Sequence, residues 1–258
     1  MDTTRSHLFR DMGVMLGRSM KHIFRSMDTI ITVCLTPIAI MLMFVYVFGG
    51  AMGAGMSTGE YVSYSLPGIL LIAIASATAY TALRLYTDMK SGFFDRFRSM
   101  PISASSALWA HVLTSLVSNA LSLGVILLAA LLMGFRSPAG ILNWLAVAGI
   151  LALFTLALTW VAVIAGLSSK SAEGAGAFSY PLIFLPFISS AFLSTETMPA
   201  AIRVFAENQP VTAIVDSIRA LLANQPVGND IWVALAWCVG ILLAAYLVAM
   251  RVYTRRAK

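Results

Sequence analysis

Six long apolar stretches constrain the fold of this chain more than any other feature. Each is 20 to 26 residues long, none contains Asp, Glu, Lys or Arg, and together they hold 132 of the 258 residues. A helix needs roughly 20 apolar residues to cross the hydrocarbon core of a membrane, and the alternating pattern of barrel strands is absent. The sequence therefore predicts an all-α polytopic membrane protein with six transmembrane helices. The predicted spans are Thr29–Phe48, Val62–Leu83, Ala107–Leu132, Trp144–Leu167, Gly174–Leu193 and Ile231–Met250.

The composition excludes several classes of protein. Hydrophobic residues make up 59% of the chain and charged residues 11%, whereas a soluble domain carries about 45–50% and about 25%. A soluble enzyme, a disordered chain and a secreted disulfide scaffold are therefore all disfavoured. The two cysteines, Cys34 and Cys238, lie within apolar stretches, where a cysteine behaves as a small hydrophobic side chain.

The basic residues are divided unequally between the predicted loops. Of 17 Lys and Arg residues, 14 fall on the side that holds both termini and 3 on the other side. Cytoplasmic loops carry such an excess, so we expect a multi-pass protein of the plasma membrane with both termini in the cytoplasm. The net charge of +6 is then a signal of topology, and no nucleic-acid partner is needed to explain it.

The first 28 residues are too polar to span the membrane but have helical periodicity. Their apolar side chains recur at spacings of three and four residues, and their basic side chains lie opposite. This pattern predicts a cytoplasmic amphipathic helix on the membrane surface; a helix packed on a soluble domain is the alternative. The apolar positions are Phe9, Met12, Leu16, Met20, Ile23 and Met27, and the basic positions are Arg10, Arg18, Lys21 and Arg25.

Two short helices are predicted between the last two spans, over about residues 197–225. Pro199 and Pro210 each resemble a proline in the first turn of a helix. After Pro210 the apolar residues form one face, and Asp216 and Arg219 mark the polar side. Helices this short cannot span, so we expect interfacial or re-entrant segments on the outer face; an ordinary surface loop is the alternative.

The loop between the second and third spans carries phenylalanines on its cytoplasmic side. Phe93, Phe97 and Met100 follow an i, i+4, i+7 pattern, and Gly92 and Pro101 bound a helix of about two turns over residues 91–101. Such rings are costly to expose to water, so the pattern favours docking into a partner's groove. Insertion into the lipid headgroup layer is the alternative. The remaining members of the segment are Phe94, Asp95, Arg96 and Arg98.

Motifs for catalysis and for an internal energy source are absent from the sequence. None of the four lysines follows a glycine, so no Walker A loop exists, and the three histidines have no metal-ligand spacing. The Gly55–Gly59 segment matches a nucleophile-elbow pattern around Ser57, but no base lies within reach, and we interpret it as a loop. Asn119, within the third span, favours helix packing through a hydrogen bond over substrate binding, and His111 is interpreted as a polar residue at a helix end.

Three segments resemble the permease subunits of type-2 ABC exporters, particularly the daunorubicin-resistance type. Two of them are Ser65-Leu-Pro67-Gly68 at the entry of the second span and the run from Gly92 to Pro101. The third pairs Glu196-Thr-Met198-Pro199 with Asn208-Gln-Pro210-Val-Thr. Phe93 and Phe94 replace aliphatic residues of the family pattern, and Gln209 is inserted between Asn208 and Pro210. For Pro67, Gly68 and Asn119 two roles stay open, lining of the transport pathway and helix packing.

The resemblance implies a division of labour between subunits. Residues 91–101 would be a coupling helix that docks on a separate ATPase subunit, and ATP and magnesium would bind there, leaving this chain without a cofactor. Two permeases, copies or paralogues, and two ATPases would form the working unit. The helices before the last span would gate the exit of a hydrophobic or amphipathic small molecule. We expect residues 29–252 to form the permease domain and residues 253–258 a basic tail.

Two other functions remain open at this stage. The first keeps the fold and exports a lipid-linked glycan, whose pathways often show a continuous lining of aromatic rings. The second is a membrane scaffold or sensor subunit that transports nothing. A stimulated partner ATPase would separate an exporter from the second alternative.

Overall fold

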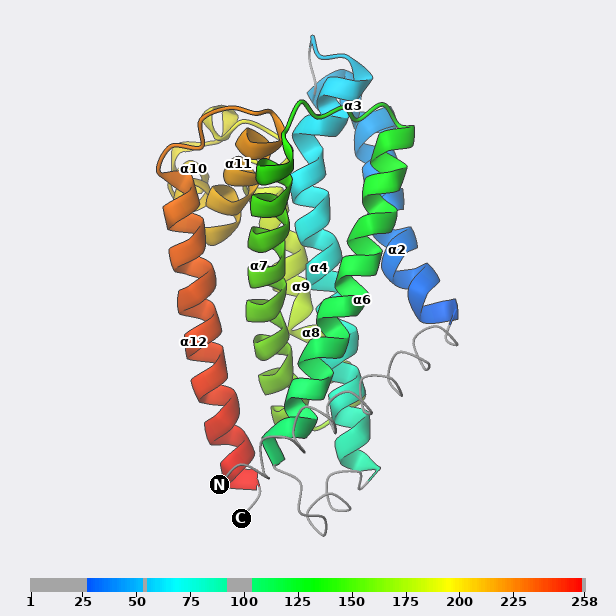
Figure 1. Ribbon diagram of the computed structural model, residues 1–258, viewed down its shortest axis with the longest axis vertical. Helices are drawn as coiled ribbons and strands as arrows, with labels where there is room; N and C mark the ends of the chain where they lie inside the picture. Colours follow the sequence, from blue (N-terminus) through cyan, green and yellow to red (C-terminus); the bar gives the residue numbers. More distant parts are fainter. Residues whose placement is uncertain (1–26, 53–54, 92–103, 257–258) are drawn as a thin grey trace.

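A computed structural model describes residues 27–52, 55–91 and 104–256. All regular structure within these ranges is helical. Four helices are long and apolar enough to cross a membrane, and they run side by side along the long axis of the molecule (Figure 1). The chain is therefore an all-α, multi-pass membrane protein. The four helices are α4 (Thr58–Lys90), α6 (Ala104–Leu132), α7 (Ile141–Ser168) and α12 (Asp230–Arg256).

These four helices contain the second, third, fourth and sixth predicted spans and extend beyond each of them at one end or both. The largest extension is that of α4, which begins before Val62 and continues past Leu83 to Lys90. At 1.5 Å per residue its 33 residues make a rod of about 50 Å, whereas the hydrocarbon core is about 30 Å thick. α12 likewise continues to Arg256, so most of the predicted basic tail is helical.

The start of α4 explains the sequence around Ser57. The Ser57 hydroxyl accepts from the backbone N–H of Glu60, and the Glu60 carboxylate accepts from the backbone N–H of Ser57 at 2.6 Å. This reciprocal pair is a capping box, which satisfies two donors at a helix start. Ser57 therefore begins a helix.

The first apolar stretch is helical but changes its geometry toward its end. α2 (Met27–Leu42) continues into the π-helical turn η1 (Met43–Phe48) and then into the short helix α3 (Gly49–Met52). The apolar segment whose side chains are described, Leu35–Phe48, is shorter than the four long helices.

The fifth predicted span is not one continuous helix. It divides into α8 (Ala172–Ala177), α9 (Ser179–Phe184) and the 3-10 turn η2 (Leu185–Ile188), and the helical run ends before Leu193. Pro181 and Pro186 each lack the N–H that a continuous helix uses, and glycines weaken α8. The expectation of an unbroken Gly174–Leu193 helix is therefore wrong.

Two short helices follow, as the sequence predicts. After the 3-10 turn η3 (Thr195–Thr197) come α10 (Ala200–Asn208) and α11 (Pro210–Leu222). They lie at the same end of the bundle as α3 (Figure 1), and we call this the cap end. The opposite end, where α4 finishes at Lys90 and α6 begins, is called the stalk end.

The interior consists of two apolar cores with a polar layer between them. The larger core reaches from the cap end to Ala75 of α4, and the smaller one surrounds Leu85 and Trp160 at the stalk end. Between them the Ser115 hydroxyl bonds to the hydroxyls of Thr81 (3.0 Å) and Thr159 (3.2 Å). Ser115 thus joins α4, α6 and α7 through hydrogen bonds.

Candidate functional site at the cap end

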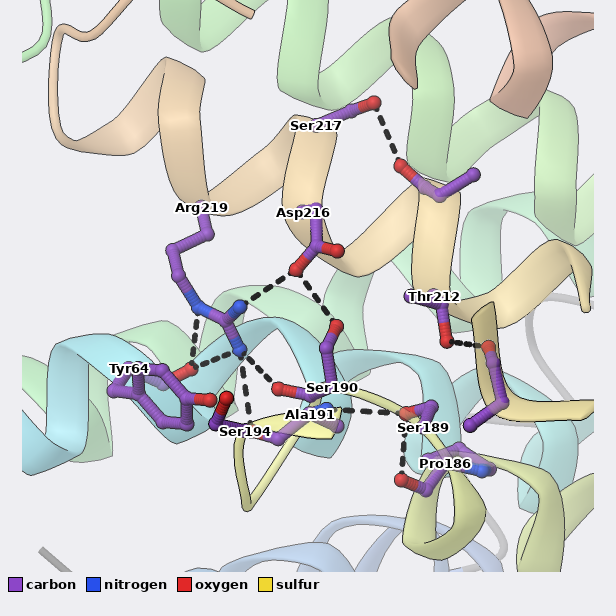
Figure 2. Close-up of polar contacts among 12 residues, drawn as sticks. Tyr64, Pro186, Ser189, Ser190, Ala191, Ser194, Thr212, Asp216, Ser217 and Arg219 are labelled. Carbon is purple, nitrogen blue, oxygen red and sulfur yellow. Dashed lines mark hydrogen bonds and ion pairs between the residues drawn. The ribbon is translucent and has the colours of Figure 1, made fainter. Parts of the chain in front are cut away.

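The most connected polar group among the described residues is the guanidinium of Arg219 on α11. Its Nη1 donates to Asp216 Oδ1 at 2.7 Å, and its Nη2 donates to the backbone oxygens of Ser190 at 2.7 Å and Tyr64 at 3.1 Å. The guanidinium also lies 3.8 Å from the centre of the Tyr64 ring. Figure 2 shows these side chains converging from three segments, which are α11, α4 and the turn after η2.

The position of Arg219 differs from the sequence prediction. Asp216 and Arg219 were expected on the polar side of an amphipathic helix, but both lie between α11 and the rest of the bundle, with side-chain exposures of 33% and 21%. α11 is buried nearly all round because it packs against α4, α7 and α12. The i,i+3 spacing indicates a shared face, and the fold decides what that face meets.

Pro67 and Gly68 of α4 lie next to the backbone that Arg219 contacts, and both affect the shape of this part of the helix. Pro67 has no N–H for the carbonyl of Ser63, which loosens this turn of the helix, and Arg219 donates to the next carbonyl, that of Tyr64. A side chain on Gly68 would place its Cβ 2.5 Å from the Cβ of Ala191. In this structure Gly68 therefore serves helix packing, because only glycine lets the turn after η2 approach α4 so closely.

Asp216 completes the contact with that turn. The Ser190 hydroxyl donates to Asp216 Oδ1 at 2.7 Å, so one carboxylate oxygen accepts from both Ser190 and Arg219. Burial raises the pKa of Asp216 and lowers the pKa of Arg219. Loss of either partner would leave the other charge half-buried and unpaired, which is costly.

Gln209 is a second anchor, and sequence reasoning missed its role. Its amide nitrogen donates to the backbone oxygens of Leu185 and Ile188, and its side chain is buried. Carbonyls at the end of a helical run lack partners within the helix, so Gln209 satisfies groups that the broken fifth stretch exposes. The one feature of the sequence that singled out Gln209 is its insertion between Asn208 and Pro210, relative to the family pattern.

The remaining predicted cap residues do not join this cluster. Asn208 is exposed and donates to the Val204 carbonyl of its own helix, and Glu196 is exposed in η3. Met198 is half-buried, and Pro199 is the N-cap residue of α10, one residue before the first turn in which the sequence places it. Pro210 is the first residue of α11, as predicted.

Asn119 bonds within its own helix. Its Nδ2 donates to the Ser115 carbonyl at 2.9 Å, and its Oδ1 is buried without a hydrogen-bond partner in the structure. The contacts between helices at this level pass through Ser115, so the packing role predicted for Asn119 belongs chiefly to its neighbour one turn away.

Two groups of predicted residues lie outside the described residues, and their roles stay predictions. One is the amphipathic N-terminal segment and the other is the loop after α4. They are Phe9, Met12, Leu16, Arg18, Lys21 and Arg25, and Gly92, Phe93, Phe94, Asp95, Arg96, Phe97, Arg98, Met100 and Pro101. Within the described ranges, no three His, Cys, Asp or Glu side chains gather in a way that could hold a metal ion.

Comparisons with known proteins agree with this architecture. Residues 10–223 match the family model described as ABC-2 type transporter. The chain is 28% identical to a Streptomyces coeruleorubidus protein, the daunorubicin resistance ABC transporter permease protein DrrB1, over 93% of this chain and 87% of that protein. It is 24% identical to a Mycobacterium tuberculosis protein named as a probable doxorubicin resistance ABC transporter permease, DrrC, over 90% and 84%. Because the family model covers most of a sequence whose long helices are apolar, the chain belongs to the ABC-2 type transporter family.

Proposed function

We propose that this chain is the membrane-spanning subunit of an exporter that moves hydrophobic or amphipathic drug-like molecules out of the cytoplasm or the inner leaflet. The observation that carries the proposal is its similarity, over nearly the whole length of both chains, to a daunorubicin resistance permease. Energy would come from a separate subunit that binds ATP and magnesium, since the sequence has no Walker A loop. This chain would then catalyse no reaction itself.

The proposed topology has six crossings. The four long helices would span the membrane together with the α2–η1 and α8–α9–η2 runs, and both termini would lie in the cytoplasm. The unequal division of Lys and Arg supports this orientation. The stalk end would then face the cytoplasm and the cap end the outside.

The proposed coupling element is the segment 91–101, with its three phenylalanines. It follows α4 in the sequence, and α4 extends past Leu83 to Lys90 at the stalk end. A docked partner would cover the apolar rings of Phe93, Phe94 and Phe97. The partners of this subunit would be the ATPase and a second permease copy or paralogue, with membrane lipids around them.

The proposed exit gate is the cap formed by α10 and α11. Arg219 and Gln209 attach α11 to α4 and to the end of η2. Because the apolar side chains of α11 are part of the large core, opening of the gate would rearrange these polar contacts and the packing of α11 together. Transport would follow when the partner ATPase closes on ATP and the two permeases rock against each other.

Co-expression with the ATPase subunit of an ABC exporter tests the proposal. We expect the two subunits to purify together, and ATP hydrolysis to rise when a daunorubicin-like compound is added to proteoliposomes, with accumulation of that compound. Stimulation by a lipid-linked glycan alone would favour glycan export. Absence of both transport and stimulation would favour a scaffold or sensor subunit.

The phenylalanines are tested in the same system. Replacing Phe93, Phe94 and Phe97 with Ala should release the ATPase while membrane insertion is retained. Replacing the exposed Phe205 of α10 with Ala is the matched control, since it lies at the cap end, and it should leave the association unchanged. Normal association in the triple variant would contradict the coupling role.

A further inference from the structure

A contact between Asp88 and His111 joins α4 to α6 at the stalk end. Asp88 Oδ2 lies 3.3 Å from His111 Nε2, and the exposed fraction of the His111 side chain is 10%. Among the residues that the structure describes, this is the only basic–acidic side-chain contact within 4.0 Å that joins two helices. The Arg203–Glu207 and Asp216–Arg219 pairs each lie within one helix.

The two residues lie on either side of the segment proposed to bind the ATPase. Asp88 is in the last turn of α4, which ends at Lys90, and His111 is in the second turn of α6, which begins at Ala104. A displacement of the segment between these helices therefore acts first on the end of α4 and the start of α6, which this contact connects.

The surroundings of the contact are firmly packed. Leu85 and Leu108, each near one member of the pair, are fully buried in the stalk-end core beside Trp160. The Tyr86 hydroxyl donates to the Lys170 carbonyl at 2.9 Å, which links α4 to the connection between α7 and α8. These contacts tie the extension of α4 to its neighbours.

The Asp88–His111 contact adds direction to this packing. Apolar contacts are non-directional, whereas a charged or hydrogen-bonded pair favours a narrow range of distances and angles. Two helices joined in this way move together. Without the pair, α4 and α6 could shift along each other and absorb the displacement.

We propose that Asp88 and His111 are positioning residues that keep α4 and α6 fixed relative to each other, so that movement of the coupling segment is transmitted to the rest of the bundle. This inference rests on the proposed function as an ATP-driven exporter. It predicts that loss of the pair lowers the number of molecules transported per ATP hydrolysed, while the ATPase remains bound and active.

The test uses the purified complex in proteoliposomes. Asp88→Ala and His111→Ala should each lower transport per ATP by about fivefold, which corresponds to about 1 kcal/mol of lost coupling between contacting residues. The exchanged double variant, Asp88→His with His111→Asp, places the same two groups on opposite helices and should recover most of the ratio. Thr87→Ala, which removes an exposed hydroxyl that bonds within α4 one residue before Asp88, is the control and should leave the ratio unchanged.

Folding and function are separated by two further measurements, the yield of assembled complex and its thermal stability in detergent. The proposed role of Asp88 and His111 is refuted if the single variants assemble normally and transport per ATP stays at the wild-type value. It is also refuted if the exchanged variant assembles as well as wild type but recovers none of the ratio. If the wild-type complex itself transports nothing, the proposed function fails, which is a different result.

Discussion

At the scale of single residues, Arg219 makes more polar contacts between the cap and the rest of the bundle than any other described side chain. Its guanidinium satisfies a carboxylate and the carbonyls of Tyr64 and Ser190, two groups that its own helix does not provide. Arginine suits this place because its planar fork presents several donors in fixed directions. A lysine would supply one charge but could not reach the same set of acceptors.

Replacing Arg219 with Gln should lower the free energy of unfolding by about 2–4 kcal/mol, because Asp216 would be left half-buried without its partner. Chemical unfolding in detergent micelles measures the loss. Arg203→Gln is the matched control, since Arg203 forms an exposed i,i+4 pair with Glu207, and pairs of that kind contribute little. Equal small effects from both variants would mean that the Arg219 contacts do not stabilise the cap.

Gly68 gives a second prediction at this scale. Gly68→Ala should cost about 1–3 kcal/mol, because the new Cβ would meet the Cβ of Ala191 at 2.5 Å and force the turn after η2 away from α4. Gly124→Ala on α6 has open space around it and should be neutral or slightly stabilising. The thermal unfolding of both variants in detergent measures the difference, and a neutral Gly68→Ala would contradict the close approach.

At the scale of elements, the broken fifth stretch and the cap depend on each other. Pro181 and Pro186 each remove one N–H from the helical run, and the run ends in carbonyls that Gln209, at the start of α11, satisfies. The break thus lets the chain turn at Ser189–Phe192, where Arg219 and Gly68 meet it. An unbroken helix would carry these carbonyls away from the cap.

Gln209→Leu should therefore loosen the end of the fifth stretch. The carbonyls of Leu185 and Ile188 would lose their donor, at a cost of about 1–2 kcal/mol. Hydrogen exchange of peptides covering residues 185–192 should become about fivefold to thirtyfold faster. Asn208→Ala, which removes an exposed side chain bonded within α10, serves as the control, and similar exchange in both variants would refute the anchoring role.

At the scale of the whole molecule, the two ends of the bundle differ in chemistry. The cap end holds the half-buried Asp216–Arg219 pair and two short helices, and the stalk end holds the Asp88–His111 contact and a small separate core. The hydroxyl layer around Ser115 lies between the two cores. A movement that begins at the stalk end must therefore pass through this layer to reach the cap.

The proposed orientation predicts how cysteine labelling divides between the two ends. With Cys34 and Cys238 replaced by Ala, Met56→Cys and Gln225→Cys at the cap end should react in intact cells with a membrane-impermeant maleimide. Lys170→Cys and Thr254→Cys should react only after the cells are opened. All four positions are exposed. The reverse pattern would place the cap in the cytoplasm, and a mixed pattern would contradict the six crossings.

The long helices could be predicted from sequence because apolar length is a local property of the chain. α4, α6, α7 and α12 each contain a predicted span, and Pro210 marks the start of α11. Family membership was accessible for a similar reason, since it depends on short motifs read in order. Pro181 and Pro186 were visible signs of the break in the fifth stretch. The prediction missed the break because it relied on the apolar length of about 20 residues alone.

The cap could not be predicted from the sequence because its contacts join residues far apart along the chain. Periodicity puts Asp216 and Arg219 on one face of a helix, but it does not say that this face meets Tyr64, which lies 155 positions before Arg219. The same holds for Gly68 against Ala191, for Gln209 against Leu185, and for Asp88 beside His111. Helix formation and membrane insertion follow from nearest neighbours, so the sequence determined them by itself. Which polar groups pair inside the bundle follows from how the helices pack, and only the tertiary structure decided it.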